Sequence, residues 1–151
     1  MAATKDIMIA WNDDFALGLP EIDDQHRTLF DIMNRLWSAI VTRATTEQML
    51  GILGDLEQYT QSHFTAEETF MRVTNYPEFD KHKKAHVGFI QRLAAEKKAV
   101  AEGKHFSLDL LNFLKDWLVS HIQVMDRAYA EIHVANQQPQ SFLGKFFQRF
   151  F

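Results

Sequence analysis

Apolar residues recur at intervals of three and four along four long segments, which is the spacing of amphipathic helices. We expect these helices at about residues 23–42, 46–72, 77–101 and 107–134. The connections between them, near residues 44, 74–76 and 103–106, are short. Short connections make successive helices antiparallel neighbours. The pattern therefore predicts an all-α protein, an antiparallel up-down-up-down four-helix bundle.

Polar residues at the predicted helix starts support these boundaries. Asp23 or Asp24 is suited to cap the first helix, and Ser107 the fourth. Thr45 and Gln48 have the spacing of a capping box before the second helix. Each of these side chains can accept a hydrogen bond from a backbone N–H that the first helical turn leaves unpaired.

The segments that flank the bundle differ from it in composition. Residues 7–19 are expected to form an extended N-terminal arm that includes Trp11 and Phe15. We place a domain boundary after residue 135, so that residues 1–135 form the bundle and residues 136–151 a polar spacer and a Phe-rich tail. As a helix, residues 142–151 would present six apolar side chains on one half and Lys145 and Arg149 on the other.

The tail therefore predicts a short C-terminal amphipathic segment. It is too short to span a membrane or to be stably helical alone, but it could lie on a surface. We favour a membrane surface or a protein partner for residues 142–151. Docking on the bundle itself and pairing with another copy remain open, and the oligomeric state is not determined.

Composition excludes several classes of protein. With 151 residues, 46% of them hydrophobic, the chain has room for one domain with a core. A formal net charge of −4 argues against a nucleic-acid binder. The absence of cysteine excludes disulfides, thiolate metal sites and cysteine nucleophiles. We see no signal peptide or spanning segment, which predicts a cytoplasmic protein, with the tail allowing a peripheral membrane position.

Histidine is the unusual feature of the apolar stripes. Five of the seven histidines lie on these stripes. They are His26, His63, His82, His86 and His121. One such histidine is usually an ordinary core residue, but each buried imidazole needs a partner, and a core does not supply five. Their convergence from four helices indicates metal ligation.

The spacing of the polar residues adds two carboxylates. His63 and Glu67 are four residues apart, so they share one face of a helix, as His82 and His86 do. Glu68 lies about 140° from His63 and is expected to face away. Asp126 follows His121 by five. Five imidazoles and two carboxylates exceed one structural zinc site and suit two irons, although ligand type alone also allows manganese or zinc.

Four motifs in order, one for each helix, resemble the hemerythrin family in its single-domain bacterial form. They are WNDDFALGLPEIDDQH (Trp11 to His26), HFTAE (His63 to Glu67), YPEFDKHKKAH (Tyr76 to His86) and HIQVMD (His121 to Asp126). Each motif alone is weak, whereas the ordered set is specific. The resemblance covers roughly residues 8 to 132.

The resemblance implies a function and a set of ligands. His82, His86 and His121 would bind one non-haem iron, and His26 and His63 the other. Glu67 and Asp126 would bridge the two irons together with an oxo or hydroxo group. Dioxygen would bind reversibly at the iron with two histidines, as in a carrier, store or scavenger. The resemblance also makes Leu29, Phe64, Trp117 and Ile122 the wall of the dioxygen pocket, with Trp11 at its mouth and Tyr129 nearby.

Other readings remain open at this point. Ordinary core packing explains each wall residue singly about as well. The same centre could belong to a di-iron enzyme acting on peroxide or nitric oxide, or to an oxygen-sensing module. The chain has no Glu-x-x-His pair of the kind that di-iron oxygenases use. Because imidazole donates less electron density than carboxylate, oxygen binding is favoured over oxidation.

The fourth helix presents a geometric difficulty. A regular α-helix would place His121 and Asp126 about 140° apart. The apolar stripe Leu111, Leu114, Leu118, His121, Met125 and Ile132 assumes such a regular helix. If both ligands reach one centre, either the helix widens into a π-bulge or Asp126 approaches from the side. His105 and His133 lie off the stripes and receive no metal role.

Overall fold

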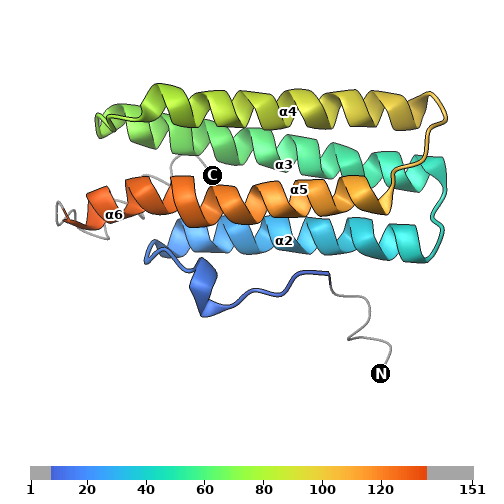
Figure 1. The fold of residues 1–151 in the computed structure, drawn as a ribbon, viewed down its shortest axis with the longest axis horizontal. Helices are drawn as coiled ribbons and strands as arrows, with labels where there is room; N and C mark the ends of the chain where they lie inside the picture. The colour runs from blue at the N-terminus through green and yellow to red at the C-terminus, as the bar shows by residue number, and fades with distance from the viewer. Residues whose placement is uncertain (1–7, 136–151) are drawn as a thin grey trace.

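The chain folds into four long antiparallel helices, as expected (Figure 1). The computed structural model describes residues 8–135. It contains η1 (Asp13–Phe15), α2 (Pro20–Val41), α3 (Thr46–Val73), α4 (Phe79–Ala101), α5 (Leu108–Ser120), η2 (His121–Asp126) and α6 (Arg127–Ala135). The last three follow one another directly and together make the fourth helix of the bundle (Figure 1).

The predicted tail at 142–151 and the spacer at 136–140 lie outside the described residues. Among residues 8–135, no helix combines the length and the apolar character that crossing a bilayer requires.

Two of the predicted helix caps are confirmed. The Thr45 hydroxyl accepts a hydrogen bond from the backbone N–H of Gln48, and the Gln48 side chain accepts one from the backbone N–H of Thr45. The Ser107 hydroxyl accepts from the N–H of Leu110 at 3.1 Å. These bonds pair N–H groups of the first turns of α3 and α5.

The predicted cap of the first helix is wrong. Helix α2 begins at Pro20, whose fixed φ suits the first helical position. Asp23 therefore lies inside the first turns, where its carboxylate accepts a hydrogen bond from the N–H of Leu17 at 3.0 Å. The side chain ties the incoming arm to the helix instead of capping it.

The N-terminal arm lies along α2, as Figure 1 shows. The side-chain oxygen of Asn34 accepts hydrogen bonds from the N–H groups of Met8 and Ile9, and its amide nitrogen donates to the carbonyl of Ile9. Farther along the arm, the Arg127 guanidinium donates to the carbonyl of Asp14 at 2.7 Å. The arm is thus fixed to both α2 and α6.

One half of the bundle is filled by aliphatic side chains. Each helix contributes a leucine with no exposed surface, and the four are Leu36, Leu53, Leu93 and Leu111. Full burial of such a side chain contributes roughly 1.5–3 kcal/mol. By their positions in the helices, these leucines lie toward the end where α2 passes into α3 and α4 into α5. A second, smaller hydrophobic cluster that includes Ile22, Phe70 and Met71 lies in the opposite half.

The fourth helix contains the π-bulge that the spacing of His121 and Asp126 suggested. Residues His121–Asp126 form the π-helical turn η2, in which the N–H of Arg127 donates to the carbonyl of Ile122, five residues back. Because bonding to the fifth residue stacks residue i+5 over residue i, both side chains face the core. They are 4% and 1% exposed.

The bulge also corrects the predicted stripe beyond it. An extra residue in the turn shifts the inward face by one position, so Asp126 replaces Met125 and His133 replaces Ile132. Ile132 is 43% exposed, whereas Ala130 and His133 are buried. The expectation that His133 lies off the core face was therefore wrong, and its ring packs against Phe70 with centroids 5.0 Å apart.

This shifted register predicts a pair of unequal substitutions. Ile132→Lys should change the free energy of unfolding by less than about 1 kcal/mol, because the side chain faces solvent. Ala130→Lys should cost roughly 2 kcal/mol or more, because it overpacks the core and buries a charge. Denaturant unfolding of both variants measures the difference. A larger loss at Ile132 than at Ala130 would reject the shifted register.

Candidate metal centre

The structure brings together all seven side chains that the sequence singled out. His26 comes from the start of α2, His63 and Glu67 from the later part of α3, and the others from α4 and η2. They gather in the half of the bundle near the turn between α3 and α4 (Figure 1). None of the seven is more than 4% exposed. Burying so many polar side chains in a core costs free energy unless hydrogen bonds or bound metal ions offset their desolvation.

The seven residues form two overlapping groups, each able to hold a metal ion. One group is Glu67, His82, His86, His121 and Asp126, and the other is His26, His63, Glu67 and Asp126. Within each group, one nitrogen or oxygen atom per residue lies within 4.8 Å of the others. Both carboxylates belong to both groups, so they lie between two sets of imidazoles.

Three imidazole nitrogens converge on one point. The Nε2 atom of His121 is 3.1 Å from that of His82 and 3.0 Å from that of His86. Two nitrogens bound at right angles to one metal, with bonds of about 2.1 Å, are separated by about 3.0 Å. The spacing thus fits three nitrogens on a single ion.

The Asp126 carboxylate lies between the two sets of imidazoles. Its Oδ1 is 3.0 Å from Nε2 of His82 and 3.3 Å from that of His121, while its Oδ2 is 3.1 Å from Nε2 of His26. Glu67 is placed similarly, because its Oε1 lies 3.5 Å from Nε2 of His63 and 3.4 Å from that of His86.

Many of these buried atoms make no hydrogen bond despite their closeness. They are both ring nitrogens of His26, Nδ1 of His82, Oε1 of Glu67 and both carboxylate oxygens of Asp126. A buried polar atom without a partner costs about 1–3 kcal/mol. Four of these six atoms, Nε2 of His26 and the three carboxylate oxygens, face other nitrogens or oxygens of the cluster, as metal ligands do. The donor set of imidazole nitrogens and carboxylate oxygens therefore fits non-haem iron.

Residues behind the cluster hold its outer atoms. The Tyr129 hydroxyl donates a hydrogen bond to Oε2 of Glu67 at 2.7 Å. Nδ1 of His63 is bonded to Oε1 of Gln25, and Nδ1 of His86 is 2.8 Å from Oε2 of Glu68. The sequence carried no signal for Gln25, whereas the shifted register of the fourth helix would have placed Tyr129 on the core face.

The expectation that Glu68 faces away needs a correction. The carboxylate does lie outside both ligand groups, and the side chain is 19% exposed. It nevertheless contacts the outer nitrogen of His86, a residue of the neighbouring helix. The angular argument described α3 alone and could not show what the adjacent helix places beside Glu68.

The two carboxylates are held in their charged form. Burial and the mutual repulsion of Glu67 and Asp126 favour protonation of Glu67, but His63 and His86 outweigh them and lower its pKa to about 2. Burial also opposes the charge of Asp126, yet His121, His26 and His82 bring its pKa well below the usual range. Both carboxylates are thus ionised at neutral pH.

The pKa values of two histidines are shifted in opposite directions. Burial lowers the pKa of His63 to about 4, although Glu67 opposes the shift, so this imidazole is neutral. Burial acts the same way on His86, but hydrogen bonds to Glu67 and Glu68 raise its pKa to about 9. Because a metal binds the neutral ring, ion uptake at His86 must release a proton.

Aromatic rings cover the cluster on its core side. Phe64 stacks on His86, with centroids 3.7 Å apart and planes 2° apart, and Trp117 stacks on His121 at 4.5 Å and 10°. Leu29 and Ile122 are buried in the same hydrophobic cluster.

Trp11, expected at the pocket mouth, packs on Phe15 and Phe30, beneath the guanidinium of Arg27. Its role at the mouth stays a prediction.

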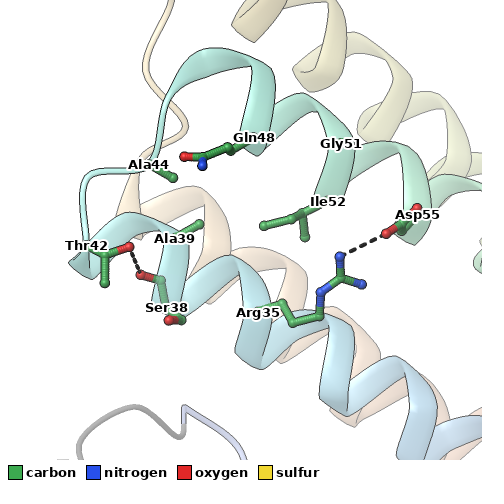
Figure 2. A pocket seen from close by; sticks show the side chains of 9 residues that line it. All are labelled: Arg35, Ser38, Ala39, Thr42, Ala44, Gln48, Gly51, Ile52 and Asp55. Carbon is green, nitrogen blue, oxygen red and sulfur yellow. Dashed lines mark hydrogen bonds and ion pairs between the residues drawn. The ribbon is translucent and has the colours of Figure 1, made fainter.

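A wide surface hollow lies elsewhere. A groove of about 570 Å³ separates the end of α2 from the start of α3, and Figure 2 shows its lining. Arg35 and Asp55 pair with each other across it at 2.9 Å, and Thr42 bonds to the backbone of Ser38. The groove is at the end of the bundle opposite the histidines and shares no residue with them.

Comparison with known proteins gives a consistent result. The sequence model described as "Hemerythrin HHE cation binding domain" matches residues 17–132. A bacteriohemerythrin of Stenotrophomonas maltophilia is 33% identical, covering 95% of this chain and 98% of its own length. Hemerythrin subunit 1 of Golfingia vulgaris is 34% identical over 79% of this chain and 88% of its own.

Solved structures agree with the sequence relatives. A crystal structure of wild-type hemerythrin superposes with a TM-score of 0.76 at 30% identity, covering 82% of this chain and 96% of that one. The residues that match the family model, 17–132, include all seven side chains of the cluster. The chain belongs to the hemerythrin family.

Proposed function

We propose that this protein binds dioxygen reversibly at a centre of two non-haem irons. The observation that supports it best is the pair of ligand groups that share Glu67 and Asp126. The function is that of an oxygen-binding protein rather than an enzyme, in agreement with relatives that are named hemerythrin and bacteriohemerythrin.

The two groups suggest how the ligands divide. His82, His86 and His121 would hold one iron, and His26 and His63 the other. Glu67 and Asp126 would bridge them, together with an oxo or hydroxo group. When bound, the irons supply the electrons that make reversible dioxygen binding possible. With two histidines instead of three, the second iron would have fewer protein ligands and would keep room for a small molecule.

The protein's part is to hold these ligands and to keep water away. Tyr129 and the outer contacts of His63 and His86 fix the ligand side chains before metal arrives. Phe64, Trp117, Leu29 and Ile122 surround them with apolar atoms. A dry, apolar wall disfavours separation of charge at the centre, so oxygen is expected to leave as neutral dioxygen rather than as superoxide.

Metal content and colour test the proposal directly. The purified protein should contain about two irons per chain. Reduced protein should gain visible absorption in air and lose it under vacuum. His82→Ala should lower both iron content and the melting temperature of the loaded protein, because metal binding stabilises the fold. The exposed His105 is the control, and His105→Ala should change neither. A single tightly bound zinc, or an irreversible spectrum, would contradict oxygen carriage.

Trp117 tests the role of the apolar wall. Trp117→Ala should retain iron but admit water, so the oxygen-dependent absorption should fade several times faster at constant temperature. Loss of the half-buried Trp117 ring should also lower the free energy of unfolding by up to about 3 kcal/mol. Trp37→Ala, on α2 about 16 Å along the helix from His26, controls for loss of a tryptophan. If both variants lose stability and the absorption fades at the wild-type rate, Trp117 is only a packing residue.

The location of the protein is a separate part of the proposal. Residues 142–151 combine six apolar side chains with Lys145 and Arg149, which suits a membrane surface or a protein partner. Such binding would place an oxygen-loaded protein near a consumer of oxygen. The bundle itself would remain cytoplasmic.

Truncation after Gln140 tests the role of the tail. The full chain should sediment with vesicles of anionic lipid, and the truncated chain should remain in the supernatant, because the apolar face and the two cations are lost. Gel filtration of both forms without lipid reports pairing between copies. A full chain that ignores vesicles, stays monomeric and loses stability on truncation would show that the tail belongs to the fold.

A further inference from the structure

We propose that Glu68 is a positioning residue for the metal centre, which acts by fixing the ring of His86 and adding negative charge behind it. This inference rests on the proposed metal centre. Glu68 adjoins Glu67 in the sequence but belongs to neither ligand group. Its only route to a metal is therefore through the histidine that it contacts.

The contact determines which nitrogen of His86 faces the ligand cluster. A carboxylate can only accept hydrogen bonds, so Nδ1 of His86 must donate to Oε2 of Glu68 across the 2.8 Å contact. In a neutral ring the lone pair is then on Nε2. That atom is 3.0 Å from Nε2 of His121 and 3.4 Å from Oε1 of Glu67, at the centre of the cluster.

Two residues of α3 hold the imidazole ring of His86 from different directions. Phe64 and Glu68 are four residues apart, so both project toward α4 from the same side of the helix. The Phe64 ring lies flat on the face of His86, and Glu68 lies at the edge of the ring. Stacking restrains the ring plane, while the hydrogen bond restrains rotation within that plane. Together they leave the imidazole little freedom before an ion binds.

The outer nitrogens of His63 and His86 have partners of different charge. Nδ1 of His63 is held by the neutral amide oxygen of Gln25, which fixes the ring but adds no charge. The centre thus has a neutral outer contact on the side of two histidines and an anionic one on the side of three. Because an anion behind an imidazole increases its basicity, Glu68 should strengthen metal binding on the side of three histidines.

Three variants separate charge, hydrogen bond and packing. Glu68→Ala removes both the acceptor and the charge, and Glu68→Gln keeps an acceptor without the charge. Glu57→Ala is the matched control, because Glu57 also lies on α3 and contacts Lys97 of α4 at 3.1 Å, about 9 Å along the helix from His63 and outside both groups. The affinity of each metal-free protein for Co²⁺ would be measured by competition with a chelator at one pH, beside denaturant unfolding.

We expect Glu68→Ala to bind Co²⁺ about 10–100-fold more weakly, Glu68→Gln to recover part of that loss, and Glu57→Ala to match the wild type within about twofold. Stability of the metal-free forms should not follow this order. In ¹⁵N-labelled, zinc-loaded protein, the Nδ1–H proton of His86 should give a protected NMR signal. The signal should shift in Glu68→Gln and exchange rapidly with water in Glu68→Ala.

The outcomes distinguish this role from the metal centre itself. A wild-type protein that binds no Co²⁺ would overturn the metal centre. Normal Co²⁺ affinity and an unchanged Nδ1–H signal in Glu68→Gln would overturn the positioning role alone, even if Glu68→Ala did not fold. Equal losses of affinity in Glu68→Ala and Glu57→Ala would also overturn it, because loss of any contact between α3 and α4 would then suffice.

Discussion

Seven buried imidazole and carboxylate side chains, gathered in one cluster, are the constraint on which the rest of this structure depends. Desolvating two carboxylates and five imidazoles opposes folding, and several of their atoms have no hydrogen-bond donor to offset the cost. The fold meets this demand by dividing its core. A large hydrophobic cluster with a fully buried leucine from each helix fills one half, and a second, smaller hydrophobic cluster that includes Ile22, Phe70 and Met71 lies in the half that holds the polar residues. Burial of these apolar side chains favours folding and offsets part of the cost of desolvating the polar cluster.

The π-helical turn follows from the same constraint. Two ligands five residues apart cannot both face the core from a regular α-helix, and η2 solves this by adding one residue to a turn. The extra residue in η2 also changes the helix beyond this turn. Every residue after the turn is rotated by one position, which buries Tyr129 and His133 and exposes Ile132. Tyr129 is thereby brought to Glu67, so the distortion that turns the Asp126 carboxylate into the cluster also supplies the hydrogen bond that holds the Glu67 carboxylate.

Helix α3 concentrates more of the site than any other element. Within six residues it provides the two ligands His63 and Glu67, the ring of Phe64 that stacks on His86, and the carboxylate of Glu68 behind the same imidazole. The neighbouring helix α4 supplies two imidazoles to this surface. The contact between α3 and α4 therefore contains residues of the polar cluster, an aromatic ring that covers it and a carboxylate that orients one of its imidazoles. Substitutions in this turn should affect several of these roles together, which is why the experiments above rely on matched controls.

The sequence alone determined the helix number, their antiparallel order and six of the seven clustered side chains, because helical periodicity places residues on a face whatever the neighbours are. Asp126 did not fit the regular stripe and was added from its position near His121 and from the family resemblance. The spacing of His121 and Asp126 conflicts with a regular helix, which left a π-bulge or a side approach of Asp126 open, and the structure contains the bulge. Only the tertiary structure decided what the other helices place beside each residue. Glu68 was expected to face away and instead contacts His86, Gln25 went unnoticed beside His63, and Asp23 ties down the arm rather than capping α2. Periodicity describes one helix at a time, whereas these contacts depend on how far one helix is displaced and rotated against the next.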